Sequence, residues 1–220
     1  GSIEWYRHQR LMPPQIVIAS GNSHKAQEIQ SLLGKEYTYL TLKDFPEAPE
    51  VKEDASSFAG NAVKKALSLV NWLKQNGALS EGWILADDSG LEVDVLDGAP
   101  GVHSARYAST TQTDNSSDED NNSKLLRELT DRVEHHRTAR FRCVIALAQA
   151  GEYAQPHIFE GSCEGRIAES ASGEHGFGYD PLFIPNGFNI SFGELGPEIK
   201  SQLSHRGAAL RQLKDWLAKD

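Results

Sequence analysis

Two adjacent carboxylates, Asp87 and Asp88, are the residues of this sequence best suited to do chemistry. They follow the apolar run Ile84–Ala86 and precede the small pair Ser89-Gly90. A short apolar run that ends in acids and a small-residue break is typical of a buried strand that carries charge to the edge of a sheet. Because α/β proteins keep their ligand sites at such edges, we expect a site here.

Carboxylates without cysteine or histidine partners favour a cation that prefers oxygen ligands, and Mg²⁺ is the usual one beside phosphates. Glu53 is a further candidate ligand. Successive side chains of a strand point to opposite faces, so Asp87 and Asp88 can share an ion only if the strand breaks at Ser89-Gly90. An isolated Asp-Asp pair also suits a turn or a helix cap, and that alternative stays open at this point.

Two segments offer positive charge or backbone N–H groups to an anion. Ser20–Lys25 lies between an apolar strand and a helix, a layout that binds anions, although it lacks the GxxxxGK[ST] spacing and also fits a plain tight turn. His205 and Arg206 follow the helix N-cap candidate Ser204. Positive charge at a helix start opposes the helix dipole, so this pair is better explained by an anionic ligand.

The glycine-rich segment Gly173–Pro185 includes the aromatic residues Phe177 and Tyr179 and the acid Asp180. Glycine permits close approach of backbone to a ligand, and an aromatic ring offers a stacking face to a base. A structural turn with buried aromatics explains the segment equally well. Taken together, the acids, the basic groups and this loop suggest Mg²⁺-dependent phosphoryl or nucleotidyl transfer to water.

The elements that must position these groups alternate strands and helices, which predicts an α/β fold. We expect strands at Gln15–Ala19, Tyr37–Leu42, Ile84–Ala86, Ala139–Ala148 and His157–Ile167, the last as one or two strands with turns or bulges at Gly161 and Gly165. We expect helices from about His24 to Leu33, from an N-cap at Ser56 or Ser57 to about Gln75, over residues 123–135 with Leu125, Leu126, Leu129 and Val133 buried, and after Ser204. Thr110–Asn122 is predicted to be an acidic surface loop.

Composition limits the class of protein. The net charge of -9 argues against binding of nucleic acid, and no apolar run approaches the roughly 20 residues of a membrane span. Cys143 and Cys163 suggest no disulfide framework, so we expect a reduced, cytoplasmic setting. We interpret residues 1–11 as an expression scar or leader, and residues 12–220 as one domain.

The sequence also resembles the inosine/xanthosine triphosphate pyrophosphatase family from Ile16 to Leu217. Six motifs in family order carry the resemblance: SGNSHK (20–25), SFAGNAVKKA (57–66), ADDSGLEVDVLDGAPGVHSARY (86–107), FEGSCEGRI (159–167), GFGYDPLF (176–183) and KSQLSHRG (200–207). The family pattern Glu-Glu-Thr-Gly-x-Thr-Phe appears here as residues 52–58, KEDASSF, which lacks one Glu and the Gly. The identity of the second metal ligand is therefore left open.

The resemblance implies an elongated mixed central β-sheet flanked by helices, with two lobes and the active cleft between them. It implies Mg²⁺-dependent hydrolysis of ITP, dITP and XTP to the monophosphate and pyrophosphate, which cleanses the nucleotide pool. It also implies a homodimer.

The resemblance assigns roles to individual residues. Asp88 would accept the proton of water and bind the metal, with Glu53 and Asp87 as further metal ligands. The triphosphate would be held by Ser20, Gly21, Asn22, Ser23, His24, Lys25, Ser89 and Lys200. The base and sugar would be held by Phe177, Gly178, Tyr179 and Asp180, with Phe177 available for stacking. His205 and Arg206 would read the purine edge.

Two other functions compete with this one. A phosphohydrolase would release orthophosphate in place of pyrophosphate. A nucleotide-binding module would bind without turnover and would tolerate loss of Asp88.

Overall fold

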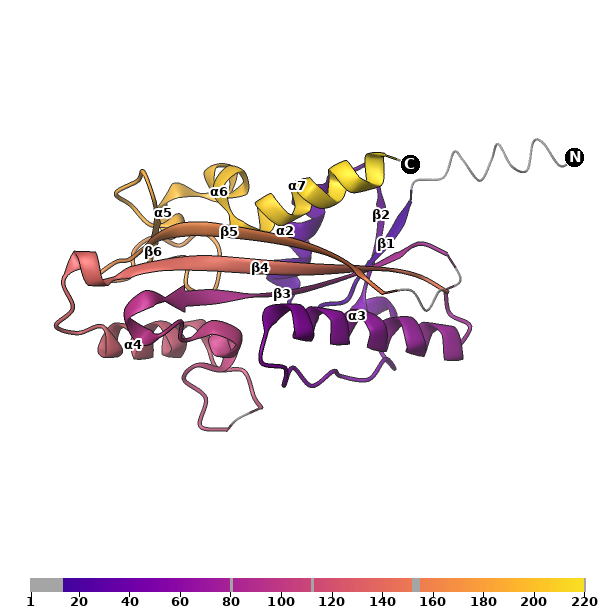
Figure 1. Ribbon diagram of the computed structural model, residues 1–220, viewed down its shortest axis with the longest axis horizontal. Helices are drawn as coiled ribbons and strands as arrows, with labels where there is room; N and C mark the ends of the chain where they lie inside the picture. Colours follow the sequence, from indigo (N-terminus) through magenta and orange to yellow (C-terminus); the bar gives the residue numbers. More distant parts are fainter. Residues whose placement is uncertain (1–13, 80, 112, 152–154, 220) are drawn as a thin grey trace, which may run out of the picture.

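A six-stranded mixed sheet runs along the molecule, in a computed structural model that describes residues 14–79, 81–111, 113–151 and 155–219 (Figure 1). The strand order is β2-β1-β3-β4-β5-β6. This confirms the expected α/β class with a mixed sheet. The segment 1–11, interpreted as a scar or leader, lies outside the described residues, and the two expected lobes stay a prediction.

The sheet changes direction at β3. β1 (Gln15–Ile18) pairs in parallel with β2 (Thr38–Thr41) and with β3 (Trp83–Val93). The remaining strands, which are β4 (Thr138–Gln149), β5 (His157–Ile167) and β6 (Phe183–Pro185), continue antiparallel. β1 pairs with β3 only as far as Leu85, so the second half of β3 extends beyond the carboxyl end of β1.

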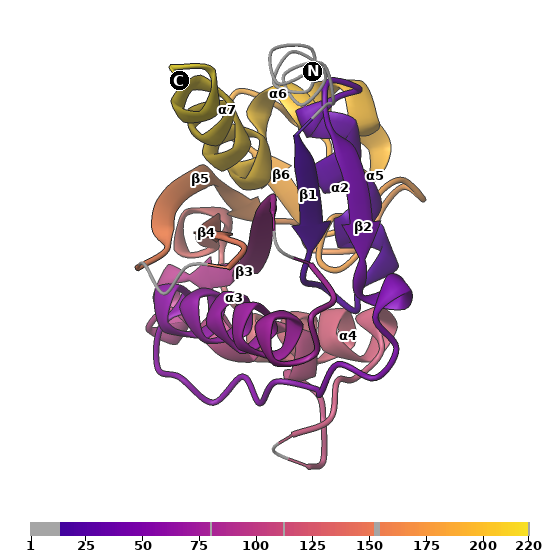
Figure 2. The same ribbon diagram turned by 90° about the vertical axis from the view of Figure 1, so that its right-hand side faces the viewer.

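Helices cover both faces of the sheet (Figure 2). α3 (Phe58–Gln75) packs on one face, where its buried residues Ala62, Ala66 and Val70 meet Ala86 and Val144 of the sheet. α2 (Ser23–Leu33) and α7 (His205–Ala218) pack on the other face. Two hydrophobic layers therefore sandwich β3 and β4.

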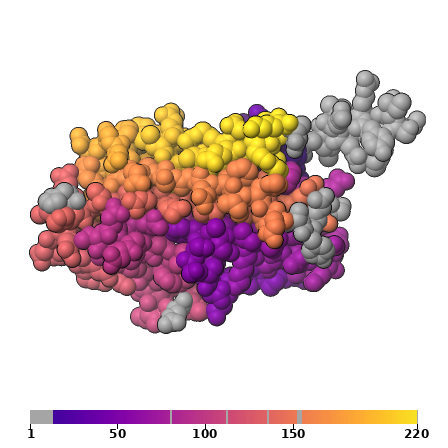
Figure 3. All heavy atoms as spheres, viewed as in Figure 1, coloured from indigo at the N-terminus to yellow at the C-terminus, as the bar shows by residue number. Residues whose placement is uncertain are grey.

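A third apolar cluster lies at the far end of the molecule, among α4 (Asp118–Glu128), β6 and α5 (Phe192–Leu195). Between this end and α7 lies the short helix α6 (Pro197–Leu203). In the space-filling view the C-terminal part runs along one long side of the molecule, opposite the N-terminal part that includes α3 (Figure 3). No described helix is long and apolar enough to cross a membrane.

Local sequence explains where the main helices begin. The Ser57 side chain accepts a hydrogen bond from Gly60 N at the start of α3, and the Ser204 side chain accepts one from Gly207 N at the start of α7. Ser204 was the predicted N-cap of its helix, and Ser57 was one of two candidates, with Ser56. Each cap satisfies one of the backbone donors that a helix start leaves unpaired.

The structure corrects three local predictions. β3 does not break at Ser89-Gly90, because Gly90 stays paired with β4 and gives room to Gly101 and Ser104, which a Cβ would meet at 2.5 and 2.6 Å. The helix after the acidic segment begins at Asp118, with Ser117 as its N-cap, since acids are favourable in a first turn. It ends at Glu128, and Val133 is 52% exposed rather than buried.

Gly161 and Gly165 also differ from expectation, because they lie within the single strand β5 and not at turns. A Cβ at Gly161 would meet His205 O at 2.1 Å, and one at Gly165 would meet Ile184 O at 2.3 Å. These glycines therefore allow α7 and β6 to approach β5 closely.

Candidate active site

The two adjacent acids of β3 point to opposite faces of the sheet. Asp87 pairs in register with Ile145, on the face that α2 and α7 cover, and Asp88 pairs with Val144, on the face that α3 covers. Both lie where β3 extends beyond β1. This is the strand alternation that a continuous β3 imposes.

Asp87 is 1% exposed and is surrounded by donors. Lys25 Nζ lies 3.0 Å from its Oδ1, Arg206 Nε lies 2.9 Å from its Oδ2, and Ser89 Oγ donates to Oδ1 at 3.1 Å. The thiol of Cys143 donates to Oδ2 at 3.1 Å. Burial raises the pKa of Asp87, but the charges of Arg206 and Lys25 outweigh it and hold that pKa well below its usual value. Both oxygens are taken by protein donors, so the arrangement does not fit the predicted metal role of Asp87.

Arg206 connects Asp87 to Glu28 of α2, a carboxylate that the sequence analysis missed. Arg206 is 1% exposed, and its guanidinium donates to Glu28 Oε1 at 2.7 Å and to Ser89 Oγ at 2.7 Å. Lys200 Nζ lies 2.8 Å from Glu28 Oε2 and 2.7 Å from Asp180 Oδ2. Ion pairs thus connect β3, α2, α6 and the glycine-rich loop.

The signal for Glu28 was weak but present. Glu28 lies one turn after Lys25 on α2, so the side chains of Lys25 and Glu28 share a helix face. A polar residue on the inward side of a helix indicates a partner, although the sequence does not say which one.

Asp88 is 6% exposed, yet it has one protein donor. Asn61 Nδ2 of α3 donates to Asp88 Oδ2 at 3.0 Å, and Asn61 Oδ1 accepts from Ala55 N at 2.9 Å. Burial raises the pKa of Asp88 to about 6, although Lys65, Lys25 and the amide of Asn61 oppose that shift. Within the described ranges no donor contacts Asp88 Oδ1.

Glu53 belongs to the loop before α3 and faces the same region. Its Oε1 lies 2.7 Å from Lys65 Nζ, which also donates to the backbone oxygen of Asp87 at 2.5 Å. Arg106 donates to the backbone oxygen of Glu53 at 3.1 Å and fixes the loop. Burial raises the pKa of Glu53, but the charge and hydrogen bond of Lys65, together with the charges of Lys25 and Arg106, outweigh it and lower that pKa overall.

The contacts of Asp88 and Glu53 show which of their oxygens are available to a metal ion. In the part of the chain that the structure describes, no three His, Cys, Asp or Glu side chains are grouped to hold a cation. Glu53 and Asp88 each keep one oxygen without a protein donor among those residues, and the charge of Glu53 contributes to the raised pKa of Asp88. Mg²⁺ is commonly bound by one or two carboxylates plus substrate phosphates, so the pair fits this ion.

The predicted phosphate loop surrounds the start of α2, next to the open half of β3. Asn22 is the N-cap and accepts from Lys25 N at 3.1 Å, while Ser20 Oγ accepts from Asn22 N at 3.1 Å. Ser20 is half-buried and Gly21 to His24 are exposed. Lys25 points to Asp87, whereas His24 stacks on Phe177.

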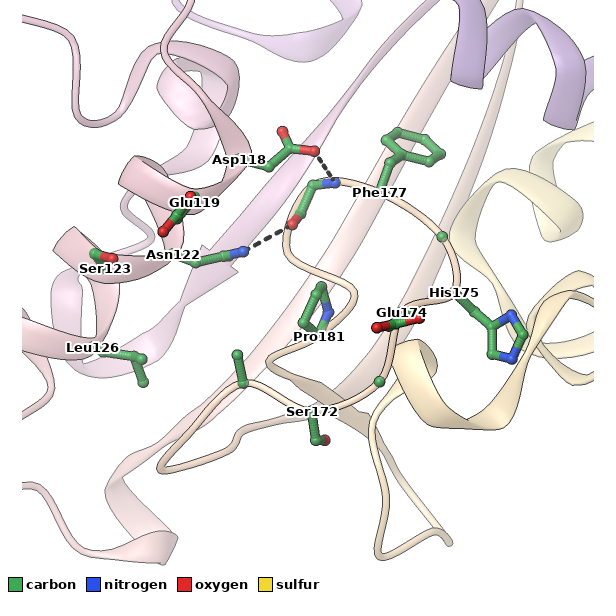
Figure 4. Close-up of a pocket in the computed structure, with 14 residues that line it drawn as sticks. Asp118, Glu119, Asn122, Ser123, Leu126, Ser172, Glu174, His175, Phe177 and Pro181 are labelled. Carbon is green, nitrogen blue, oxygen red and sulfur yellow. Dashed lines mark hydrogen bonds between the residues drawn. The ribbon is translucent and has the colours of Figure 1, made fainter.

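The glycine-rich loop is held by hydrogen bonds to its backbone (Figure 4). Asp118 accepts from Gly178 N at 2.8 Å, Asn122 donates to Gly178 O at 3.1 Å, and Asp180 accepts from Phe177 N at 3.0 Å. Positive φ angles of 76° and 60° at Gly176 and Gly178 shape the turn around Phe177.

Two residues of this region have protein partners that the sequence did not predict. Tyr179 is 5% exposed within the far apolar cluster, and its hydroxyl donates to Ser104 O at 2.6 Å, so its side chain does not fit the predicted contact with base or sugar. Lys200, predicted to hold phosphate, is buried between Asp180 and Glu28 with its Nζ 4.6 Å from the centroid of Phe177. Lys200 thus lies at the aromatic loop.

Two cavities flank the glycine-rich loop. One of about 280 Å³ lies between α2 and the loop, and His24, Glu28, Phe177, Lys200 and Ser204 are among its lining residues. The other, of about 550 Å³, lies between α4 and the loop, and Asp118, Asn122 and Pro181 are among its lining residues (Figure 4). The smaller cavity adjoins the charged network, so we regard it as the one that belongs to the site.

His205, at the start of α7, is buried and stacks on Phe141 with ring centroids 4.7 Å apart. Burial and the neighbouring cation of Arg206 lower the pKa of His205 well below its usual value, so the ring is neutral. Its Nδ1 is buried and has no hydrogen-bond partner among the described residues. An unpaired buried nitrogen costs free energy, which a ligand contact would recover.

Comparison with known proteins gives one consistent result. A sequence model described as "Ham1 family" matches residues 16–216. Proteins named dITP/XTP pyrophosphatase from Desulforamulus reducens and Geobacter sulfurreducens are each 46% identical over 204 residues, which cover 92% of this chain and 95% and 96% of theirs. The solved HAM1 protein of Coxiella burnetii is 39% identical with a TM-score of 0.78, covering 94% of this chain and 100% of that one. The Ham1 protein of Staphylococcus aureus is 36% identical with a TM-score of 0.78, covering 93% and 98%.

Proposed function

Because the chain belongs to the Ham1 family, we propose that it hydrolyses nonstandard purine nucleoside triphosphates (ITP, dITP and XTP) to the monophosphate and pyrophosphate. Similarity over 92% of the chain to proteins named dITP/XTP pyrophosphatase supports this reaction class. The single observation that carries the proposal is Asp88, a buried carboxylate with one oxygen free of protein donors and a pKa of about 6.

Asp88 is the general base in this proposal. With a pKa of about 6 it is ionised at neutral pH and still basic enough to take a proton from water. The water oxygen forms a bond to the α-phosphorus while the bond from that phosphorus to the bridging oxygen breaks. Pyrophosphate leaves, and the proton of the water passes to Asp88 Oδ1.

Positive charge and backbone N–H groups around the half of β3 that extends beyond β1 receive the phosphates. The N-terminal end of α2 supplies unpaired backbone donors, and Lys25 and Lys65 supply cations beside the two acids of β3. These groups are fixed before substrate arrives, since Lys25 and Lys65 already contact Asp87. Preorganised donors of this kind stabilise the charge that develops during phosphoryl transfer.

Glu53, through its oxygen that lacks a protein donor, would hold Mg²⁺ together with the carboxylate of Asp88, and the phosphates of the substrate would complete its ligands. When bound, Mg²⁺ would neutralise phosphate charge and polarise the α-phosphoryl group. Asp87 has a separate role, because it orients Lys25 and Arg206.

The smaller cavity would take the base. Its volume of about 280 Å³ is near the lower limit of about 300 Å³ for ligand pockets, which suits a ring system better than a whole nucleoside triphosphate. Phe177 offers a stacking face, and His205 and Arg206 follow the cavity residue Ser204 in the chain. Donors aimed at a 6-oxo group would be left unpaired by the 6-amino group of ATP, and such a loss can reduce specificity constants by about 10⁴-fold.

The test is a rate comparison of ITP, dITP, XTP, GTP and ATP with pyrophosphate and orthophosphate measured separately. We expect pyrophosphate from ITP, dITP and XTP, little product from GTP and ATP, and none in EDTA. Stoichiometric orthophosphate without an added pyrophosphatase would contradict the proposal in favour of a phosphohydrolase. Absence of any product together with tight binding would favour a binding module. The proposed homodimer and cytoplasmic setting are tested separately, by light scattering and by fractionation.

A further inference from the structure

We propose that His24 occupies, in the free protein, the face of Phe177 on which a purine base stacks, and that the base displaces it. The inference rests on the proposed function, because it assigns the base to Phe177. It moves His24 from the predicted phosphate contacts to the control of base binding.

The two rings form a stacked pair between α2 and the glycine-rich loop. Their centroids are 5.5 Å apart and their planes are inclined by 16°. Stacked aromatic pairs have centroids about 4.5–7 Å apart, so this spacing is one stacking contact and leaves no room for a third ring. A base can reach that face only if one of the two rings moves.

The other groups over Phe177 are not free to move. Lys200 Nζ lies 4.6 Å and the Arg206 guanidinium carbon 5.8 Å from the centroid of Phe177. Both side chains are buried, and both are paired with Glu28. His24 is exposed, and no hydrogen bond or ion pair of its imidazole is found in the described part of the chain. It is therefore the group whose displacement breaks the fewest contacts.

The backbones on either side are held, so the pair cannot open as a clamp around a base. Ala26, Ile29 and Leu33 bury α2 against the sheet, and the ion pair of Lys25 with Asp87 anchors its first turn. Phe177 is fixed through its own N–H by Asp180 and through its neighbour Gly178 by Asp118 and Asn122. A rotation of the His24 side chain is the smaller change, since exposed rotamers exchange in picoseconds to nanoseconds.

This arrangement has a measurable consequence. A base that binds must first break the stacking contact between His24 and Phe177, so that contact weakens binding. Loss of one aromatic pair corresponds to a change in affinity of about two- to tenfold. His24→Ala should therefore lower the KM for ITP, and the Kd for IMP, by about two- to tenfold.

The matched control is His157, an exposed histidine outside the site. The centroid of its ring lies 4.2 Å from the ring centroid of Trp216. His157→Ala also removes a histidine–aromatic contact, a tilted one with ring planes inclined by 40°, and should leave both constants unchanged. A second variant, His24→Phe, keeps the ring and should raise KM or leave it as in the parent. An unchanged or higher KM for His24→Ala would overturn the inference, because it would mean that His24 is neutral or contacts the substrate.

A spectroscopic readout separates this inference from the proposed function. In the free protein the His24 ring protons should resonate upfield because of the Phe177 ring, and His24→Ala identifies these signals. Saturation with IMP should shift them to the position of an exposed histidine. Bound IMP with unmoved His24 signals would overturn the inference alone. Absence of both IMP binding and hydrolysis of any nucleoside triphosphate by the parent protein would overturn the proposed function, and the inference with it.

Discussion

Asp87 and Asp88 are neighbours in the chain, but their carboxylates lie on opposite faces of β3 and have opposite shifts of pKa. Asp87 is saturated by Lys25, Arg206, Ser89 and Cys143 and stays ionised. Asp88 has one amide donor, Asn61, which lowers its pKa only in part. Burial is the larger effect and raises the pKa of Asp88 to about 6. One side of the strand thus fixes cations and the other supplies a base, a division that two acids with different environments achieve.

Asp88→Asn should abolish turnover while the fold persists. General base catalysis contributes about 10²- to 10⁴-fold, so we expect kcat to fall by at least that factor. In the parent protein kcat/KM should fall as pH decreases through about 6, because protonated Asp88 cannot accept a proton. Initial rates between pH 5 and 8 check this. An acidic limb below pH 4.5 would show that another group is the base.

The same substitution should stabilise the protein above pH 6. Because the pKa of Asp88 is raised to about 6 in the folded protein, the folded state binds more protons than the unfolded state between about pH 4 and 6. The contribution of Asp88 to stability therefore decreases as pH rises through that window. Each pKa unit corresponds to about 1.4 kcal/mol, so Asp88→Asn should gain up to about 3 kcal/mol at pH 8. Urea unfolding at pH 8 and pH 4 measures it, and a gain that is equal at both pH values would contradict this explanation.

Sequence reasoning predicted the parts of the fold that depend on local pattern. Alternating apolar residues marked β4, and Ser57 and Ser204 marked helix starts. The partners within the site were not predictable, because they depend on tertiary approach. Arg206 and Glu28 are 178 residues apart in the chain.

The error at Ser89-Gly90 has a similar cause. Glycine in a strand interior suggests a break when only the sequence is read. In the structure the 3₁₀ helix Gly101–Arg106 packs against Gly90, and a side chain at position 90 would clash with that helix. A requirement set by packing partners distant in sequence leaves no local pattern, and the same holds for Asn61, whose partner Asp88 is 27 residues away.

Asn61 should be a positioning residue for Asp88. Its amide donates to Asp88 and its carbonyl oxygen accepts from Ala55 N, so it links the base to the loop that carries Glu53. The donated hydrogen bond lowers the pKa of Asp88, and Asn61→Leu should therefore move the acidic limb of kcat/KM to higher pH and reduce kcat by about tenfold. Asn61→Asp should move that limb further, because a second carboxylate disfavours ionisation of Asp88. An acidic limb that stays in place while Tm falls would indicate a purely structural role.

Gly161→Ala should lower the stability of the protein and weaken substrate binding, although Gly161 lies outside the site. A Cβ at this position would meet His205 O at 2.1 Å and Ala209 N at 2.8 Å, so α7 must shift and carry Arg206 with it. Overpacking of this kind costs about 1–3 kcal/mol. We expect lower stability in urea and a higher KM for ITP. Ser162→Ala, an exposed change on the same strand, is the control and should alter neither. A stable Gly161→Ala with unchanged KM would show that α7 adjusts without moving Arg206.

Glu53→Gln should raise the Mg²⁺ concentration needed for half-maximal rate, because Gln keeps the shape of the side chain and removes its charge. Asp54→Asn is the matched control, since Asp54 is the next acid in the chain, is exposed, and pairs with Lys64 outside the Asp88 region. Loss of a ligating carboxylate should raise that concentration by about tenfold or more, as mutations around metal sites do. The loss of negative charge next to Asp88 should also lower the pKa of Asp88, because the charge of Glu53 raises it. Titrations of rate against Mg²⁺ at pH 8, where Asp88 is ionised in both proteins, separate the two effects. Equal Mg²⁺ dependence in Glu53→Gln and the parent would place the second carboxylate ligand elsewhere.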